Sequence, residues 1–165
     1  MAPLRRFDDW PEQLDAFVES RRAMPFAWKE NDCCTFAFDA IEAMTGRKVW
    51  PEVTWSTAME AMRVLQEEGG LTGLWTKAMR APPSHNHLEA QRGDVVLAED
   101  PQGREITMLC LGSSLCGPGE KRLEFWPLDR GRLTWRVGLS VAITNSLPNL
   151  VTANARGASE DQIDD

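Results

Sequence analysis

Apolar residues recur every three to four positions in the first half of the chain, a spacing that predicts helices. The clearest segment is 33–45, CCTFAFDAIEAMT, whose apolar residues fall on one face of a helix. Asn31 or Asp32 can cap its start, and Gly46 suits the position just after its end. Weaker patterns predict three further helices, at residues 10–22, 56–68 and about 72–80.

Methionines give the predicted helix 56–68 its apolar side. Ser56 can cap the start of this helix, and Gly69 can end it. Because Met is a common filler of irregular cores, we expect the stripe to be part of the core and not a cofactor contact. The stripe consists of Ala58, Met59, Ala61, Met62 and Leu65.

The pattern changes after a polar loop at 81–93, APPSHNHLEAQRG. Short strand-like runs separated by Gly, Pro and Asp follow. These runs are DVVLAE (94–99), EITMLCLGS (105–113), RLEFWPL (122–128), LTWRV (133–137) and LSVAIT (139–144). Helices before strands predict an α+β fold in which N-terminal helices pack on a C-terminal antiparallel sheet. Periodicity ends near residue 145, so we expect one domain over 1–144 and a polar, acidic tail over 145–165.

The charge balance narrows the possible functions. The chain of 165 residues has a net charge of −7, which argues against non-specific binding to nucleic acid. No apolar run approaches the roughly 18 residues of a membrane span, so we expect no membrane insertion. The N-terminus MAPLRRFDDW lacks the apolar region of a secretory signal, which favours synthesis and folding in a cytoplasm. The seven Trp either fill the core or anchor a protein interface.

Cys33 is the candidate for chemistry. A cysteine at the start of a helix lies near free backbone N–H groups and the positive end of the helix dipole, which favour the nucleophilic thiolate. The neighbouring charge of Asp32 opposes this effect. Cys33 is therefore either a nucleophile or a small packing residue, whereas we expect Cys34 to be part of the core.

The remaining cysteines and the two histidines leave further alternatives open. Cys110 and Cys116 lie in CLGSSLC, a spacing that is not typical of zinc sites. An iron–sulfur cluster on all four thiols is a conceivable alternative, but we expect no cofactor and no metal. His85 and His87 either are solvated loop residues, hold a cation together, or supply a base to Cys33.

Three stretches together resemble the NlpC-type, papain-like cysteine peptidases of cell-wall turnover: DCCTFAFDAI, RGDVVLAED and ITMLCLGS, within 28–46 and 91–112. The resemblance implies a helix-first α+β fold with an antiparallel sheet. It places Cys33 at the nucleophile position and Gly93–Asp94 on the family's Gly-Asp pair. It also places Ile106 where the family has its catalytic His, so the domain resembles a peptidase that has lost its base. Asp94 itself is expected to be a turn residue that bonds nearby backbone.

A broader pattern resembles small proteins of siphophages and gene-transfer-agent-like particles. The matching stretches are DDWPEQLDAF, MPFAWKENDCCTFAFDAIEAMTG, QRGDVVL and TWRV, spread over most of residues 8–137. Genes for such proteins tend to lie among tail-tip genes, beside the baseplate hub. The resemblance therefore implies a tail-tip component of the virion with a degenerate peptidase fold.

We expect the chain to be a structural protein of a phage tail tip or baseplate, catalytically inactive and made in the host cytoplasm. Its expected partners are the baseplate hub and the central tail-tip protein. The first alternative is an active cysteine amidase or endopeptidase that uses Cys33 to cut peptidoglycan during DNA entry. The second is a tail-tip protein that carries a metal or an iron–sulfur cluster.

Overall fold

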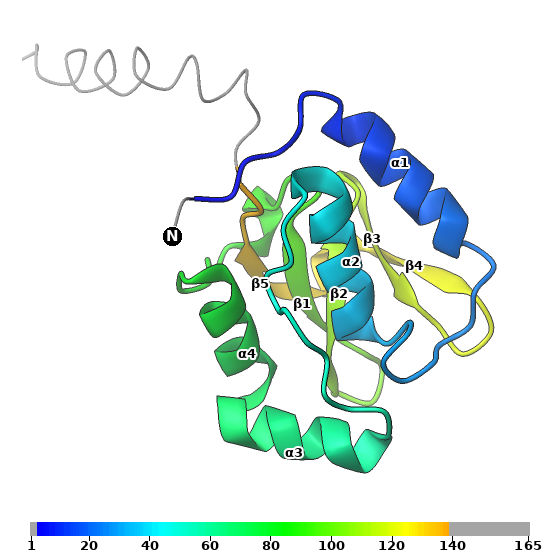
Figure 1. Cartoon of the computed structure of the whole chain (residues 1–165), viewed down its shortest axis with the longest axis vertical. Helices are drawn as coiled ribbons and strands as arrows, with labels where there is room; N and C mark the ends of the chain where they lie inside the picture. Colours follow the sequence, from blue (N-terminus) through cyan, green and yellow to red (C-terminus); the bar gives the residue numbers. More distant parts are fainter. Residues whose placement is uncertain (1–2, 139–165) are drawn as a thin grey trace, which may run out of the picture.

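The computed structural model describes residues 3–138 and confirms an α+β fold (Figure 1). Four helices precede a five-stranded antiparallel sheet with the strand order β4-β3-β2-β1-β5. The helices are α1 (Trp10–Arg21), α2 (Cys33–Thr45), α3 (Ala58–Glu68) and α4 (Gly70–Met79). The strands are β1 (Val95–Glu99), β2 (Glu105–Cys110), β3 (Ser114–Pro118), β4 (Leu123–Pro127) and β5 (Gly131–Trp135), with 3₁₀ turns η1 (His87–Glu89) and η2 (Leu128–Arg130).

One strand and one helix cap are among the features in which the sequence-based assignment differs from the structure. β3 has no counterpart among the predicted strands, because its sequence SLCGP contains Gly117 and Pro118, which strands usually avoid. α3 is capped by the hydroxyl of Thr57 and not by Ser56, whose backbone N–H instead donates to Glu60. The run 139–144, the domain boundary at 144 and the tail 145–165 lie outside the described residues.

α2 crosses one face of the sheet and forms the centre of the core (Figure 1). Alternation along β1 directs Val95 and Leu97 toward the helices, while Val96 and Ala98 face the other side. There a smaller apolar cluster completes the interior of the domain, with Leu128 of η2 packed against it. The sheet thus separates two apolar clusters, and a residue's position along a strand decides which cluster it joins. No helix within residues 3–138 is long and apolar enough to cross a membrane.

The two methionines of the α3 stripe do not lie in the core, which corrects the expectation from the sequence. Met59 and Met62 are 74% and 69% exposed. Ala61 and Leu65 of the same stripe do pack against the core, together with Val64, and Ala61 is buried. The helix lies at the edge of the domain and touches it through α4, so a narrow strip of small and branched residues suffices for packing (Figure 1).

A buried ion pair joins the N-terminal segment to the sheet. The Arg6 guanidinium donates to Asp94 Oδ1 at 3.2 Å, to the Val137 carbonyl at 2.7 Å and to the Arg92 carbonyl at 2.9 Å. Asp94 also accepts from the backbone N–H groups of Gln91 and Val137, which confirms its expected role as a turn residue. Burial raises the pKa of Asp94 and lowers that of Arg6, so these hydrogen bonds are what keep the charges tolerable inside the protein.

The pair also explains the glycine before Asp94. Gly93 has a φ of +94°, and a Cβ added there would lie 2.9 Å from Met44 Sδ and 3.0 Å from Arg6 Nη1. A side chain at this position would therefore need a strained backbone and would collide with the buried guanidinium. The Gly-Asp motif thus has a structural role in this chain.

Replacing Asp94 by Ala should lower the free energy of unfolding by about 3–5 kcal/mol, because it leaves a buried guanidinium without its counter-charge. Chemical denaturation of the full chain measures this loss. Glu19→Ala is the matched control, since Glu19 forms an exposed ion pair with Arg22 that should contribute less than about 1 kcal/mol. Equal losses in the two variants would contradict a structural role for the buried pair.

Candidate functional site

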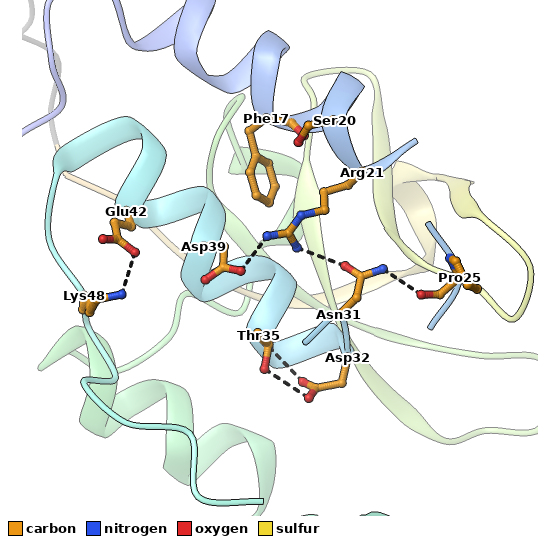
Figure 2. Close-up of polar contacts among 10 residues, drawn as sticks. All are labelled: Phe17, Ser20, Arg21, Pro25, Asn31, Asp32, Thr35, Asp39, Glu42 and Lys48. Atoms are coloured by element: carbon orange, nitrogen blue, oxygen red, sulfur yellow. Dashed lines mark hydrogen bonds and ion pairs between the residues drawn. The ribbon is translucent and has the colours of Figure 1, made fainter. Parts of the chain in front are cut away.

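A buried carboxylate fixes the start of α2. Asp32 caps the helix by accepting from the Thr35 backbone N–H at 2.9 Å and from the Thr35 hydroxyl at 3.0 Å (Figure 2). It also accepts from the Lys29 backbone N–H and from Trp55 Nε1, both at 2.8 Å. The carboxylate is 2% exposed, so its position is set by these donors and not by solvent.

Arg21 connects α1 to the same region. Figure 2 shows its guanidinium between Asp39 of α2, at 2.7 Å, and the side-chain oxygen of Asn31, at 3.0 Å. The amide of Asn31 donates in turn to the Pro25 carbonyl. This chain of polar contacts holds the loop that precedes Cys33 against two helices.

The two adjacent cysteines face strand β2. Cys34 is buried in the core, as expected, and its sulfur lies 3.7 Å from Thr107 Oγ1. Trp75 Nε1 of α4 donates to the same hydroxyl at 2.9 Å. Cys33 is half-buried and packs against the edge of the core, so its thiol is the more accessible of the two.

The thiols of Cys33 and Cys34 differ in acidity. A hydrogen bond from the Cys34 thiol, reinforced by the backbone N–H of Thr107, lowers the pKa of Cys33 against the opposing effects of burial and the Asp32 charge. The same shared hydrogen bond, together with burial, raises the pKa of Cys34. The thiol of Cys33 is therefore the more acidic of the two, and the hydrogen bonds from Cys34 and Thr107 are the cause.

Thr107, and not Ile106, is the residue of β2 that faces these cysteines. Ile106 packs against the cluster on the opposite face of the sheet, so a side chain at this position points away from Cys33. Because side chains alternate along a strand, a residue of β2 that is to contact Cys33 has to stand at position 107 and not at position 106. The signal that could have identified Thr107 is its position as the one polar residue between Ile106 and Leu111.

The histidines belong to a segment that borders β5, which β1 separates from β2. His87 is in η1, which packs on the edge strand β5, and it lies near Gly131 and Val96 on the face opposite the helices. His85 follows Ser84, which pairs with Thr134 of β5. β1 separates β5 from β2, so neither imidazole is placed to take a proton from Cys33. The position of this loop beside β5 disfavours the alternative in which it supplies a base to Cys33.

The four thiols do not converge either. Cys110 belongs to the cluster on one face of the sheet, whereas Cys34 and Cys116 belong to the core on the other. Burial raises the pKa of Cys116 to about 12. All four cysteines are free thiols, and residues 3–138 contain no group of three or more His, Cys, Asp or Glu side chains that could hold a metal. The sheet rules out a cluster on all four sulfurs.

Residues 5–137 match a family described as a domain of unknown function, DUF6950, and the chain belongs to this family. The matched range includes every helix and strand of the structure, the Arg6–Asp94 pair and both cysteines of the site. Neither the curated proteins nor the solved structures include a match to the chain.

Asp32→Ala should lower the free energy of unfolding by about 3 kcal/mol, because it removes a helix cap and leaves the buried Trp55 N–H without an acceptor. Thermal or chemical denaturation measures the loss. Thr57→Ala is the matched control, since Thr57 caps the exposed helix α3 and should contribute about 1 kcal/mol. Similar losses for both caps would contradict the special role given to Asp32.

Proposed function

We propose that this member of the DUF6950 family is a structural component of a phage tail tip or baseplate, in which a non-catalytic, NlpC-like domain docks on the baseplate hub. The arrangement of elements supports the peptidase-like part of the proposal. A cysteine begins the helix that crosses an antiparallel sheet, and the Gly93–Asp94 pair leads into the strand next to β2. The same elements in the same order are implied by the resemblance of the sequence.

The observation that carries the non-catalytic part is the identity of the groups around Cys33. Thr107, Cys34 and the backbone are the partners that set its acidity, and none of them is a base near neutral pH. The carboxylate of Asp32 accepts four hydrogen bonds from other donors. A cysteine hydrolase needs a base that activates the thiol and later protonates the leaving group. In the described part of the chain, no side chain at this site supplies that function.

An exposed aromatic surface supports the docking part. The segment after α1 runs beside the turn between β3 and β4, where the Phe26 backbone N–H donates to the Gly119 carbonyl. Trp28 lies in the first of these segments and Phe125 lies in β4, which follows the turn; they are 39% and 43% exposed. Aromatic side chains on a surface are typical anchors of protein interfaces. We therefore assign contact with the hub to this surface, defined by Met24, Trp28 and Phe125.

Complementation of a particle-forming system that lacks the gene tests the proposal. We expect the Cys33→Ala variant to restore complete, infectious tails, because assembly needs the fold and not the thiol. We expect a variant with Trp28→Glu and Phe125→Glu to fold but to be missing from purified particles, because charges would replace the docking anchors. Electron microscopy of the tails and a count of infectious particles are the measurements.

Two outcomes would contradict this function. Complete and infectious tails in the absence of the chain would remove the structural role. Complete but non-infectious tails with Cys33→Ala would show that the thiol does chemistry.

A second candidate function, a cysteine amidase or endopeptidase acting on peptidoglycan, is favoured by the lowered pKa of Cys33. Alkylation of the full chain across a range of pH tests its chemical premise. We expect Cys33 to react first, with a midpoint below the ordinary cysteine value of about 8.5, and Cys34 to stay protected. Asp32→Asn should lower this midpoint further, because the Asp32 charge raises the pKa of Cys33.

Turnover then separates the two functions. A reactive Cys33 without release of peptidoglycan fragments fits a thiol that has kept its helix-start acidity and has no base. Release of fragments that is abolished by Cys33→Ala would establish the enzyme.

A further inference from the structure

A basic groove lies on the side of the domain where the ends of α2 and α4 meet the N-terminal segment. It is open and has a volume of about 1470 Å³. Its cationic lining residues are Arg47, Lys48, Lys77, Arg80 and Arg136, against the single carboxylate of Glu42. The side chains of Leu4 and Trp50 add apolar wall between these charges. Such a concentration of positive charge is unexpected in a chain whose net charge is −7.

The cations of the groove are only partly neutralised by the domain itself. Lys48 pairs with Glu42 at 3.0 Å, and Lys77 pairs with Glu68 at 3.2 Å. Within residues 3–138, Arg80 forms no ion pair with an acidic side chain, and Arg136 forms none at contact distance, although its charge lowers the pKa of the buried Asp94. Like charges held together on a surface repel one another, and an anionic ligand relieves that repulsion. The groove is therefore built to receive carboxylates or a similar anion.

We propose that the occupant is the acidic C-terminal segment of the same chain, residues 159–165, SEDQIDD. This segment carries Glu160, Asp161, Asp164 and Asp165 and no cation. Its two acidic pairs, Glu160–Asp161 and Asp164–Asp165, match a groove that presents separated guanidinium and ammonium groups. The inference does not rest on the tail-tip function and can fail or hold independently of it.

The place where the described chain ends supports this occupant. Gly138 is itself a lining residue of the groove, and a Cβ added to it would lie 3.0 Å from the Leu4 carbonyl oxygen. Residues 139–159 could span up to about 70 Å when extended, so the acidic segment can reach every lining residue from this point. A short tether also raises the effective concentration of the segment at the groove to about the millimolar range, which favours the chain's own tail over a separate molecule.

Nucleic acid is a poorer occupant. Phosphate backbones bind through extended cationic surfaces, whereas the rest of this chain is acidic and would repel a long polyanion. A short acidic peptide avoids this repulsion because it can lie inside the groove.

Carbodiimide cross-linking of the full chain tests the proposal, since this reagent joins carboxylates to amines that lie in contact. The chain has four lysines: Lys48 and Lys77 line the groove, and Lys29 and Lys121 do not. Trypsin releases the acidic segment as the peptide 157–165 after Arg156, so mass spectrometry can identify its partner. We expect this peptide to be joined to Lys48 and Lys77 in clear excess over Lys121.

Charge-reversal variants and isotope mixing make the test specific. Arg80→Glu should reduce the cross-links to Lys48 and Lys77 several-fold, because it replaces an attractive charge in the groove by a repulsive one. Arg122→Glu is the matched control, an exposed arginine outside the groove, and should leave their yield unchanged. A mixture of ¹⁵N-labelled and unlabelled chains should give no mixed-label products.

Three results would overturn the proposal. The first is equal cross-linking of the acidic peptide to groove and control lysines. The second is a yield that does not respond to Arg80→Glu. The third is a share of mixed-label products near one half in an equimolar mixture, the share that random pairing between chains produces, which would assign the groove to the tail of a second copy.

Discussion

The start of α2 depends on one buried carboxylate. Asp32 receives hydrogen bonds from the loop before the helix, from the first turn of the helix and from Trp55 in the segment that follows it. Because a buried carboxylate must find donors for its lone pairs, these three parts of the chain are held in one arrangement. The adjacent Cys33 takes its position and its surroundings from that arrangement. The interaction that stabilises the helix start also raises the pKa of Cys33, so stability and thiol acidity are opposed at this point.

The sheet places the reactive side chains of the domain on two different faces. Residues that alternate along β1 and β2 lie either under α2 or under the turns η1 and η2. A hydrolytic pair requires both of its members on one face, within hydrogen-bond reach. In this chain Cys33 lies on the helix side, while His87 lies on the other side against Val96. The chain has both residue types of a cysteine hydrolase, but the topology keeps them apart.

The sequence predicted those features that depend on local signals. α2 begins and ends where its cap, its apolar period and Gly46 indicate, because these signals act within a few residues. The class of the fold followed from helices preceding strands. Predictions failed for features that depend on contacts between segments far apart in the sequence. The exposure of Met59 and Met62 depends on how far α3 lies from the sheet, and β3 forms despite Gly117 and Pro118 because β2 and β4 lie on either side of it.

The candidate site shows the same limit. The sequence alone was enough to identify a cysteine at a capped helix start. It was not enough to identify the residue of β2 that faces this cysteine, because a shift of one position along the strand replaces Thr107 by Ile106. Only Asp94 of the Arg6–Asp94 pair was identified from the sequence. Arg6 lies 88 residues away in the sequence, and no local pattern marks it. Residues that meet across the fold can be paired only once the register of the strands is known.

The position of β2 that faces the two cysteines is part of the core packing. Thr107 is fully buried, accepts from Trp75 and lies beside the Cys34 sulfur. A histidine at this position would insert a ring into a filled core and would displace the acceptor of the Trp75 N–H, each of which costs free energy of about 1–3 kcal/mol. Trp75 is itself fully buried against Phe38 of α2, so it cannot move aside without disturbing the helix that carries Cys33. Placing a base opposite Cys33 would therefore require several coordinated substitutions. Thr107 and Trp75 instead join α2, α4 and the sheet through buried contacts.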